Sequence, residues 1–538
     1  MTRDIEHRNA VDALIRDPTN AAKAQRVLRL AIDDPRRASI VRESIAPAHP
    51  MLPLDLRREE YRRNNLRMPE RPKRVTSPDR LRDLIEVMKS SADRFLPLKA
   101  IGDGYGFANT GFTRGTLISF VNDMDDILEV EANLLREPNE ISRLLQFESG
   151  ATIEKLNTYL SARGLALLNQ PGFDKLTFAG TMSSGGHGSG IWSGPLSSQV
   201  RSIHLLTVGS QREILEVRVE PKNGITDPAK WKLAHPHVEL VQDDDLFHAC
   251  TCSMGCLGVI YALTIEIRGA YSVLENRRKL PWTEVRAMLP QLLAEQGPHK
   301  RLHSVEIWIN PYAVDGEVRC VLGERSETKD PPRGERGLGI EFGGSEFLFR
   351  VLSWWMQHHP STIPCLIDAA LGATESLDVV RPAPEGLNFG GPNQAPVLAA
   401  AVGVPAANIG DTADGMIDFF QKRRTVAGAN ITSPIGLRFV KAAEAHLSPA
   451  HGRDTCMIEV PILEGTPHAR ETLGAFLTFM YEQFGGRPHW GQYNPMPGDH
   501  LDSLYPALPA FLQTFKALNP KGYLDNAFTE QMGFRVRT

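Results

Sequence analysis

Hydrophobic positions recur along the chain with two different spacings, and these spacings predict where helices and strands lie. Apolar residues at helical spacing predict an amphipathic helix over 81–88, and the polar run Thr76–Asp79 before it is typical of a helix cap. A second helix is expected over 153–163, closed by Gly164, because glycine favours helix ends. A third is expected over 509–518, with its proline in the first turn.

Short apolar runs predict strands, and several of them stand next to glycine-rich turns. The runs lie at 98–101, 117–121, 144–148, 203–208 and 257–267. Because they alternate with predicted helices and short glycine turns, they predict a first domain that contains both kinds of element.

The regions on either side of this domain have a different character. Glycine motifs become sparse beyond about residue 270, and the region 271–485 mixes strands, helices and tryptophan-rich segments, which indicates a second, substrate-shaping domain. Residues 1–70 are predicted to form a charged, helical N-terminal extension, and arginines are frequent from Leu56 to Arg74. Such a basic run is typical of a solvated face or a partner-binding arm, so packing on the chain and homo-oligomer formation remain the alternatives.

Composition and charge exclude several classes of protein. The chain has 538 residues, of which 42% are hydrophobic, and 60 basic against 64 acidic side chains leave a net charge of −4. This near-neutral balance argues against a nucleic-acid partner, which would select a basic surface. No run of ~18 apolar residues predicts a membrane span, and no secretory signal is recognised, so a cytoplasmic protein without a membrane partner is expected.

The six cysteines are too few for a disulfide scaffold. Cys250, Cys252 and Cys256 stand close together, but no second cluster with zinc-finger spacing follows them, and no metal site is predicted. They are interpreted as reduced, buried thiols.

Two glycine-rich runs are the strongest chemical signal in the chain. They are Gly102-Asp103-Gly104-Tyr105-Gly106 and the segment from Gly180 to Gly190. Successive glycines let backbone N–H groups converge on one point, where a pyrophosphate is a common guest. Neither run has the Rossmann or P-loop spacing, and each alone is equally well explained as a tight turn. Two of them in one domain favour an extended dinucleotide lying between two lobes.

On these residues the sequence resembles the FAD-linked oxidoreductases of the vanillyl-alcohol oxidase superfamily, and among them the aldonolactone and alditol oxidases. The resemblance rests on Ile101–Phe107, Phe178–Gly190, Cys252–Ile267 and Pro488-His489-Trp490-Gly491, with a weaker match at Leu447–Asp454. It implies an α+β fold with a two-lobed, PCMH-type FAD-binding domain over 71–270. A cap domain on an antiparallel sheet would span 271–485, and the segment 486–538 would return to the FAD-binding domain.

The resemblance also implies which residues surround FAD. The residues expected to bind the cofactor are Gly102, Asp103, Gly104, Tyr105, Gly106, Phe107, Thr177, Gly180, Ser184, Gly185, Gly186, His187, Ser189, Ile260 and His489. Many relatives attach FAD through a histidine in the first glycine run, where this chain has Tyr105, or through a cysteine that 169–173 lacks. We therefore expect noncovalent FAD, with a phenolic link through Tyr105 or attachment at another residue as the alternatives.

The predicted catalytic residues are Arg438, Glu459, His489, Gln492 and Tyr105. Polyol-oxidising relatives have a Glu-x-Arg pair where this chain has Gly436-Leu437-Arg438, and a lysine where it has Gln492, which puts polyol oxidation in doubt. Arg438 could stabilise an anionic reduced flavin or bind a carboxylate. Glu459, His489 or Tyr105 would take the proton. A structural ion pair, for Arg438 or Glu459, and a satisfied structural histidine are the alternatives.

Three functions follow from these residues. The first is an FAD-dependent oxidase or dehydrogenase that transfers a hydride from a small alcohol-type or lactone-type substrate, with dioxygen or another electron acceptor. The second is oxidation or oxidative decarboxylation of a carboxylic acid bound by Arg438. The third is an inactive, flavin-binding accessory protein.

Overall fold

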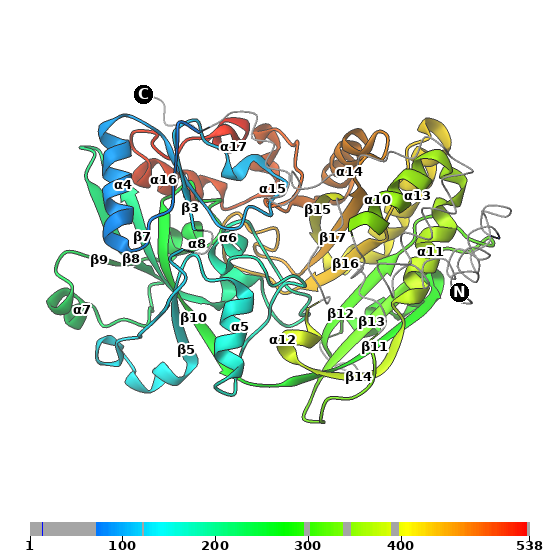
Figure 1. The fold of residues 1–538 in the computed structure, drawn as a ribbon, viewed down its shortest axis with the longest axis horizontal. Helices are drawn as coiled ribbons and strands as arrows, with labels where there is room; N and C mark the ends of the chain where they lie inside the picture. The colour runs from blue at the N-terminus through cyan, green and yellow to red at the C-terminus, as the bar shows by residue number, and fades with distance from the viewer. Residues whose placement is uncertain are drawn as a thin grey trace, which may run out of the picture.

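The computed structural model describes residues 72–534 apart from 121–122, 295–301, 337–345 and 389–396, together with Ala13. The predicted N-terminal extension therefore lies outside the described residues except at that one position. The described chain folds into two units that lie side by side (Figure 1). The first unit is built mainly from the early part of the sequence, and the second mainly from its middle part.

The first unit contains two sheets. A three-stranded parallel sheet has the order β1 (Arg74–Thr76), β3 (Thr116–Ser119), β2 (Leu98–Ile101). A seven-stranded sheet runs β4 (Ile127–Leu128), β5 (Leu144–Glu148), β10 (Val259–Gly269), β7 (Val200–Val208), β8 (Ile214–Glu220), β9 (Glu239–Gln242), and β6 (Leu165–Leu167) also pairs with β10. Its helices are α4 (Leu81–Asp93), α5 (Ile153–Ser161), α6 (Phe178–Ser183), α7 (Pro228–Ala234) and α8 (Asp244–Cys250).

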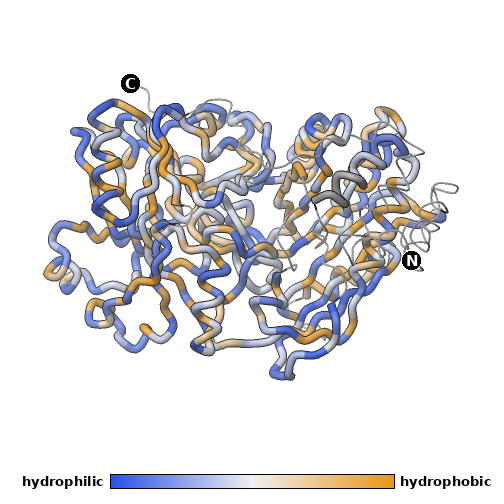
Figure 2. The backbone as a smooth tube through the Cα atoms, in the orientation of Figure 1, coloured by the Kyte–Doolittle hydropathy of each residue, from blue (hydrophilic) through white to orange (hydrophobic). Residues whose placement is uncertain are grey.

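Burial of apolar strand positions holds this unit together. Figure 2 shows hydrophobic positions concentrated along its interior strands. Leu84 and Met88 of α4 are fully buried and pack between the two sheets against Ile118 and Leu206. The predicted helix is confirmed, but its predicted polar cap is not. Thr76 belongs to β1, and Arg80 takes the cap position in extended backbone without a side-chain cap bond.

The second unit is built on an eight-stranded antiparallel sheet, the cap sheet. Its order is β14 (Ser376–Pro382), β11 (Ser272–Pro281), β13 (Arg319–Thr328), β12 (Leu302–Ile309), β16 (Ile435–Val440), β17 (Thr455–Leu463), β15 (Val397–Pro405), β18 (Arg487–Pro488). Its helices are α9 (Trp282–Leu292), α10 (Glu346–His358), α11 (Ile363–Ala373), α12 (Ala383–Gly386), α13 (Ile409–Ala427) and α14 (Ala469–Phe484).

Alternation along the strands gives the cap sheet two chemically different faces. Val402 and Ile458 point to one face and are fully buried in a core with Phe420 and Phe476 of α13 and α14. Neighbouring positions such as Ala401, Arg438 and Glu459 point the other way, and we call this side the inner face. The inner face is the one that can meet a ligand.

The C-terminal segment returns to the first unit. After β18 it forms α15 (Leu501–Leu504), α16 (Leu508–Leu518) and α17 (Ala527–Gln531), which lie on the side of the first unit in Figure 1. Trp490 and Phe511 are fully buried in one cluster with Phe147 and Phe178 of the first unit. Short 3₁₀ turns complete the described chain at Asn109–Gly111, Ala132–Leu134, Pro138–Arg143, Leu196–Gln199, Pro360–Thr362, Ala406–Asn408 and Gly498–His500.

Three sequence expectations concern features outside the cavity between the two units. All six cysteines are buried and free, so the prediction of buried thiols is confirmed. In the described ranges no helix combines the length and apolarity that a bilayer crossing requires. Within the same ranges, His, Cys, Asp and Glu side chains do not gather into a group of three that could hold a metal ion.

Candidate active site

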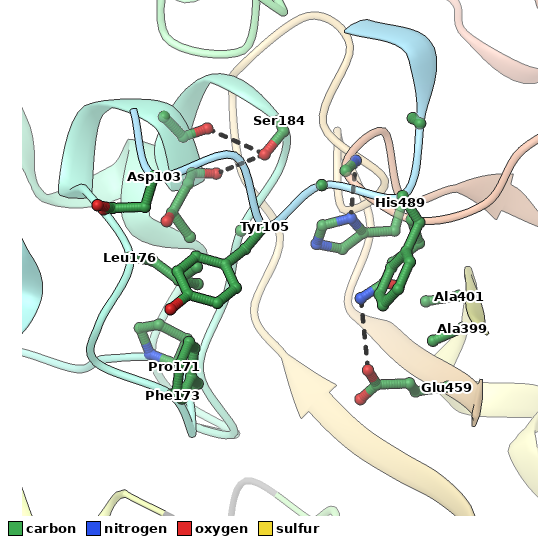
Figure 3. A pocket seen from close by; sticks show the side chains of 18 of the residues that line it. Asp103, Tyr105, Pro171, Phe173, Leu176, Ser184, Ala399, Ala401, Glu459 and His489 are labelled. Atoms are coloured by element: carbon green, nitrogen blue, oxygen red, sulfur yellow. Dashed lines mark hydrogen bonds between the residues drawn. The ribbon is translucent and has the colours of Figure 1, made fainter. Parts of the chain in front are cut away.

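A cavity of about 720 Å³ lies between the first unit and the inner face of the cap sheet. The two glycine runs form its first-unit wall, and β15, β16 and β17 contribute the opposite wall. The segment that follows β18 brings His489 and Gln492 to the same space. In Figure 3, Tyr105, Pro171, Phe173 and Leu176 face Ala399, Ala401 and Glu459 across it.

The second glycine run lies closely against the end of α6. A side chain at Gly186 would place its Cβ 2.2 Å from Thr181 Cγ2 and 2.6 Å from the Thr181 carbonyl oxygen. Gly186 can approach so closely because it has no Cβ, and its N–H donates to that same carbonyl oxygen over 2.8 Å. The loop therefore forms a shallow wall of backbone, a shape suited to a flat or extended ligand.

Most of the residues predicted to bind the cofactor do line this cavity. Those that line it are Gly102, Asp103, Gly104, Tyr105, Gly106, Phe107, Thr177, Gly180, Ser184, Gly186, His187, Ile260 and His489. Gly185 and Ser189 are not brought to it. The Ser189 hydroxyl instead donates to Glu306 Oε1 over 2.5 Å, because the chain has left the loop by then and reaches the cap sheet.

Two neutral histidines lie together on the cavity wall. The rings of His187 and His489 have centroids 5.6 Å apart in an edge-to-face arrangement. Burial, with the nearby charge of Arg438, lowers the pKa of His187 to about 3 and that of His489 to about 4. His489 Nδ1 accepts a hydrogen bond from the Gly491 N–H at 3.1 Å, so in the neutral ring the proton sits on Nε2. His489 is therefore a hydrogen-bond donor toward the cavity and is poorly suited to accept a proton.

These histidines are expected to make the protein sensitive to acid. In the unfolded chain their pKa is about 6.5, so between about pH 6.5 and 4 the unfolded state binds more protons and stability falls as the pH falls. Each histidine should cost about 2 kcal/mol of unfolding free energy at pH 5. Urea unfolding at pH 7 and pH 5 measures this loss. His489→Gln should remove about half of it, and an unchanged loss in the variant would contradict the assignment.

Arg438, Glu459 and Gln492 form a polar cluster at the cap side of the cavity. Arg438 Nη2 lies 3.2 Å from Glu459 Oε2, and Gln492 Nε2 lies 3.4 Å from Glu459 Oε1. The Arg438 side chain is 9% exposed and that of Glu459 is 25% exposed, so the carboxylate remains open to the cavity. Three of the five predicted catalytic residues are thus in direct contact.

The acidic group that seemed missing from position 436 is present one strand away. Gly436 of β16 pairs directly with Glu459 of β17, so the Glu459 side chain emerges beside position 436. A side chain at Gly436 itself would place its Cβ 2.7 Å from the Trp308 ring, which fills that space. Arg438 is therefore paired with a carboxylate from the neighbouring strand, although position 436 of its own strand carries none.

Charges of alternating sign continue from this cluster across the cap sheet. Glu275 on β11, Arg325 on β13, Glu306 on β12, Arg438 on β16 and Glu459 on β17 follow one another, and we call them the charge row. Arg325 joins Glu275 at 2.7 Å and Glu306 at 2.9 Å, with all three side chains nearly inaccessible. Burial alone would raise the pKa of Glu306, but the charges of Arg325 and Arg438 hold it at about 2. The buried carboxylate of Glu306 in this row therefore holds the Arg438 guanidinium in place by electrostatic attraction.

Tyr105 lies apart from the polar cluster. Its ring packs edge-to-face on Phe173 with centroids 5.1 Å apart, and Figure 3 places it beside Pro171 and Leu176 on the first-unit wall. Burial and the charge of Asp103 raise the pKa of Tyr105, although Lys175 opposes this. A phenol in this setting keeps its proton, so Tyr105 is a wall residue rather than a candidate base.

Comparison with known proteins assigns a cofactor to this geometry. The model of an FAD binding domain matches residues 72–214, and that of the D-arabinono-1,4-lactone oxidase family matches residues 272–532. The first match falls within the first unit, and the second spans the cap sheet and the C-terminal segment that returns to the first unit. The L-gulono-1,4-lactone dehydrogenase of Mycobacterium tuberculosis is 23% identical over 463 residues, which are 86% of this chain and 96% of that relative.

The chain belongs to the vanillyl-alcohol oxidase superfamily of FAD-linked oxidoreductases. Another superfamily relative, the alditol oxidase of a Streptomyces species, is 25% identical over 397 residues, covering 73% of this chain and 81% of the relative. Cholesterol oxidase from Brevibacterium sterolicum superposes with a TM-score of 0.67 at 12% identity, covering 85% of this chain and 93% of that chain. The predicted two-lobed FAD-binding fold and its antiparallel cap are confirmed.

Membership of the superfamily settles the cofactor and the class of reaction. The protein is an FAD-dependent oxidoreductase that acts on a small organic substrate and passes electrons to an acceptor, as the sequence predicts. The carboxylic-acid and inactive-protein alternatives are not favoured, because the matched relatives are lactone and alditol enzymes.

Among the lining residues that sequence reasoning did not single out, Lys99 and Trp308 have the clearest chemical roles. Lys99 is 2% exposed, its ammonium donates to the Met254 carbonyl oxygen, and burial lowers its pKa to about 8. A lysine inside an apolar strand directly before a glycine run was the available signal for it. Trp308 lies under Arg438, whose Cζ is 5.4 Å from the ring centroid, and its strand carried no motif.

Proposed function

We propose that this protein oxidises an alcohol-type or lactone-type carbon and that Glu459 accepts the substrate's hydroxyl proton. FAD, when bound, supplies the acceptor for the two electrons that leave the substrate carbon as a hydride. The supporting observation is the contact of Glu459 with Arg438 at an open cavity wall. His489 is a weaker candidate base because its Nδ1 already accepts a backbone N–H.

Arg438 and Gln492 have supporting roles in this proposal. The Arg438 guanidinium lies beside the carboxylate, where its charge can stabilise negative charge that develops on the substrate oxygen. Gln492 donates to the second oxygen of Glu459 and so orients the carboxylate. Because Arg438 already forms an ion pair with Glu459, a substrate carboxylate at Arg438 would be repelled by the negative charge of Glu459. This repulsion disfavours oxidation of a carboxylic acid.

The part of the cavity wall formed by the first unit fits the phosphate groups of FAD. The buried ammonium group of Lys99 lies beside Gly255, and its Nζ is 3.0 Å from the position that a Cβ at Gly255 would take. This positive charge suits the negative charge of the two phosphates. The backbone wall at Gly186 suits close approach of an extended group. We propose that these residues hold FAD, and that it is noncovalent because Tyr105 replaces the linking histidine.

After acid precipitation of the holoenzyme, the yellow colour of the flavin should stay in the supernatant rather than in the pellet.

The test of the proposed function is anaerobic mixing of the purified holoenzyme with polyols, aldonolactones, simple alcohols and carboxylic acids. Bleaching of the flavin absorbance by an alcohol or lactone is the expected result, and admission of air with a peroxide assay then tells whether dioxygen restores the colour. Bleaching by acids alone would overturn the proposal.

We also propose a cytoplasmic location, which the six free thiols support.

The cofactor wall yields a prediction of its own. Gly186→Ala should weaken FAD binding about tenfold, because the new Cβ would push the loop off the Thr181 carbonyl oxygen. The measurement is FAD titration of the apoprotein by fluorescence quenching. Gly269→Ala is a matched control, since a Cβ there meets nothing within 4 Å. Equal affinities for the two variants would contradict the placement of FAD at this loop.

A further inference from the structure

The cavity continues beyond the polar cluster into a region with an entirely different lining. Past Trp308 it is enclosed by α10 and α11 on one side and by the ends of β15 and β17 on the other. The side chains there include Leu352, Met356, Leu366, Ile367, Val397 and Leu463, and we call this region the apolar chamber. Leu366 and Ile367 are nearly inaccessible to outside solvent, at 2% and 1% exposed.

In the described part of the chain, the charged side chains that line the cavity lie outside the apolar chamber. Among the described residues that line it, the acidic and basic ones are Lys99, Asp103, Arg438 and Glu459. Lys99 and Asp103 belong to the first-unit wall, and the other two to the polar cluster. The chamber's polar side chains, Thr432 and Ser433, come from the loop before β16. A ligand that extends from Glu459 into the chamber therefore meets hydrocarbon over most of its length.

Trp308 marks the boundary between the two regions. Its ring faces Arg438 at 5.4 Å and fills the space above Gly436, and it also belongs to a small apolar cluster with Val321 and Leu371. A polyol or sugar lactone placed here would leave several hydroxyl groups without partners, and each such group is costly to bury. A hydrocarbon body has no polar groups that would be left without partners, and its transfer from water into the chamber lowers the free energy.

We propose that the substrate is an amphipathic alcohol, with one oxidisable carbinol at Glu459 and a hydrocarbon body in the apolar chamber. This inference rests on the proposed function for the reacting end and adds the chemical class of the rest of the molecule. In the reaction the hydroxyl proton goes to Glu459, and FAD, when bound, would take the hydride that leaves the carbinol carbon, so that a carbonyl product remains. The hydrocarbon body takes no part in the chemistry and sets specificity through binding.

Chain-length dependence tests this assignment with the holoenzyme. Butan-1-ol, hexan-1-ol, octan-1-ol, xylitol and L-gulono-1,4-lactone are compared, both for perturbation of the oxidised flavin spectrum and for anaerobic flavin reduction. We expect the dissociation constant of the n-alkanols to fall about threefold to fourfold per methylene until the chamber is full. We also expect octan-1-ol to bind at least 100-fold more tightly than xylitol. Tighter binding of xylitol or the lactone, or no dependence on chain length, would overturn the assignment.

Two chamber variants sharpen the test by shifting the preference in opposite directions. Ala370 of α11 lines the chamber, so Ala370→Leu should shorten the preferred alkanol, whereas Ile367→Ala should lengthen it. General loss of stability cannot shift length preference both ways. Leu233→Ala, at an 87% exposed position on α7, is the control and should leave the preference unchanged. Identical chain-length profiles in all variants would overturn the proposal.

The two readouts separate failure of this inference from failure of the proposed function. Flavin reduction by xylitol or the lactone, with weak alkanol binding, overturns the apolar chamber as a substrate site and leaves the oxidase function intact. Chain-length-dependent binding of alkanols without any flavin reduction supports the chamber as a ligand site and overturns alcohol oxidation.

Discussion

Glu459→Gln is expected to slow anaerobic flavin reduction by about two to four orders of magnitude. The substitution removes the proton acceptor and keeps the size of the side chain and its hydrogen-bonding reach toward Gln492, which lies 3.4 Å away in the parent. The loss should therefore fall on the rate of reduction at saturating substrate, measured by stopped-flow absorbance, and hardly on flavin content. A reduction rate within threefold of the parent would show that another group takes the proton.

The control for this variant is Glu239→Gln, an exposed carboxylate on β9 outside the cavity. It removes the same charge from the first unit and should leave the reduction rate unchanged. A solvent isotope effect that appears in Glu459→Gln and is absent from Glu239→Gln would further tie the slow step to transfer of the hydroxyl proton.

Arg438→Met is expected to affect both rate and stability. Loss of the guanidinium beside the developing oxygen charge should lower flavin reduction by about 100- to 1000-fold. The variant also leaves Glu306 and Glu459 with one fewer counter-charge, and removal of one partner from a buried pair costs about 3 kcal/mol of unfolding free energy. Arg438→Lys should recover part of both losses because it keeps the charge.

A double variant separates the two effects. Adding Glu306→Gln to Arg438→Met removes a buried carboxylate that keeps Arg325 but has lost the charge of Arg438, so urea unfolding should show partly recovered stability without recovered reduction rate. Recovery of both would mean that Arg438 acts on catalysis only by stabilising the fold. Recovery of neither would mean that Glu306 and Arg438 are not coupled through the charge row.

Local sequence patterns were sufficient for elements whose apolar spacing is unbroken. The strand expected at 144–148 is β5, and the helix expected over 153–163 is α5, followed by Gly164 at a φ of 68°. The cap of α4 was misassigned because several polar residues precede the helix and only the path of β1 decides which of them stands next to it.

The candidate site was predictable as a set of residues but not as an arrangement. The glycine runs and the HWG motif place Gly186 and His489 near one ligand through short-range sequence alone. The neighbourhood of Gly436 and Glu459 depends instead on the register of β16 against β17, and a shift by one residue would turn the carboxylate to the other face. The apolar chamber draws on α10, α11 and two distant strands, so no sequence window contains it.

The connections between the two units determine how substrate can enter. Only Ala270 and Tyr271 separate β10 of the first unit from β11 of the cap sheet, and β18 is hydrogen-bonded into the cap sheet directly before His489. Ser189 adds a buried bond to Glu306 between the same units. A hinge that swung the cap away would break this bond and pull His489 with it. Entry and exit of substrate are therefore expected through small displacements of helices and side chains at the rim of the cavity, while the two units keep their relative positions.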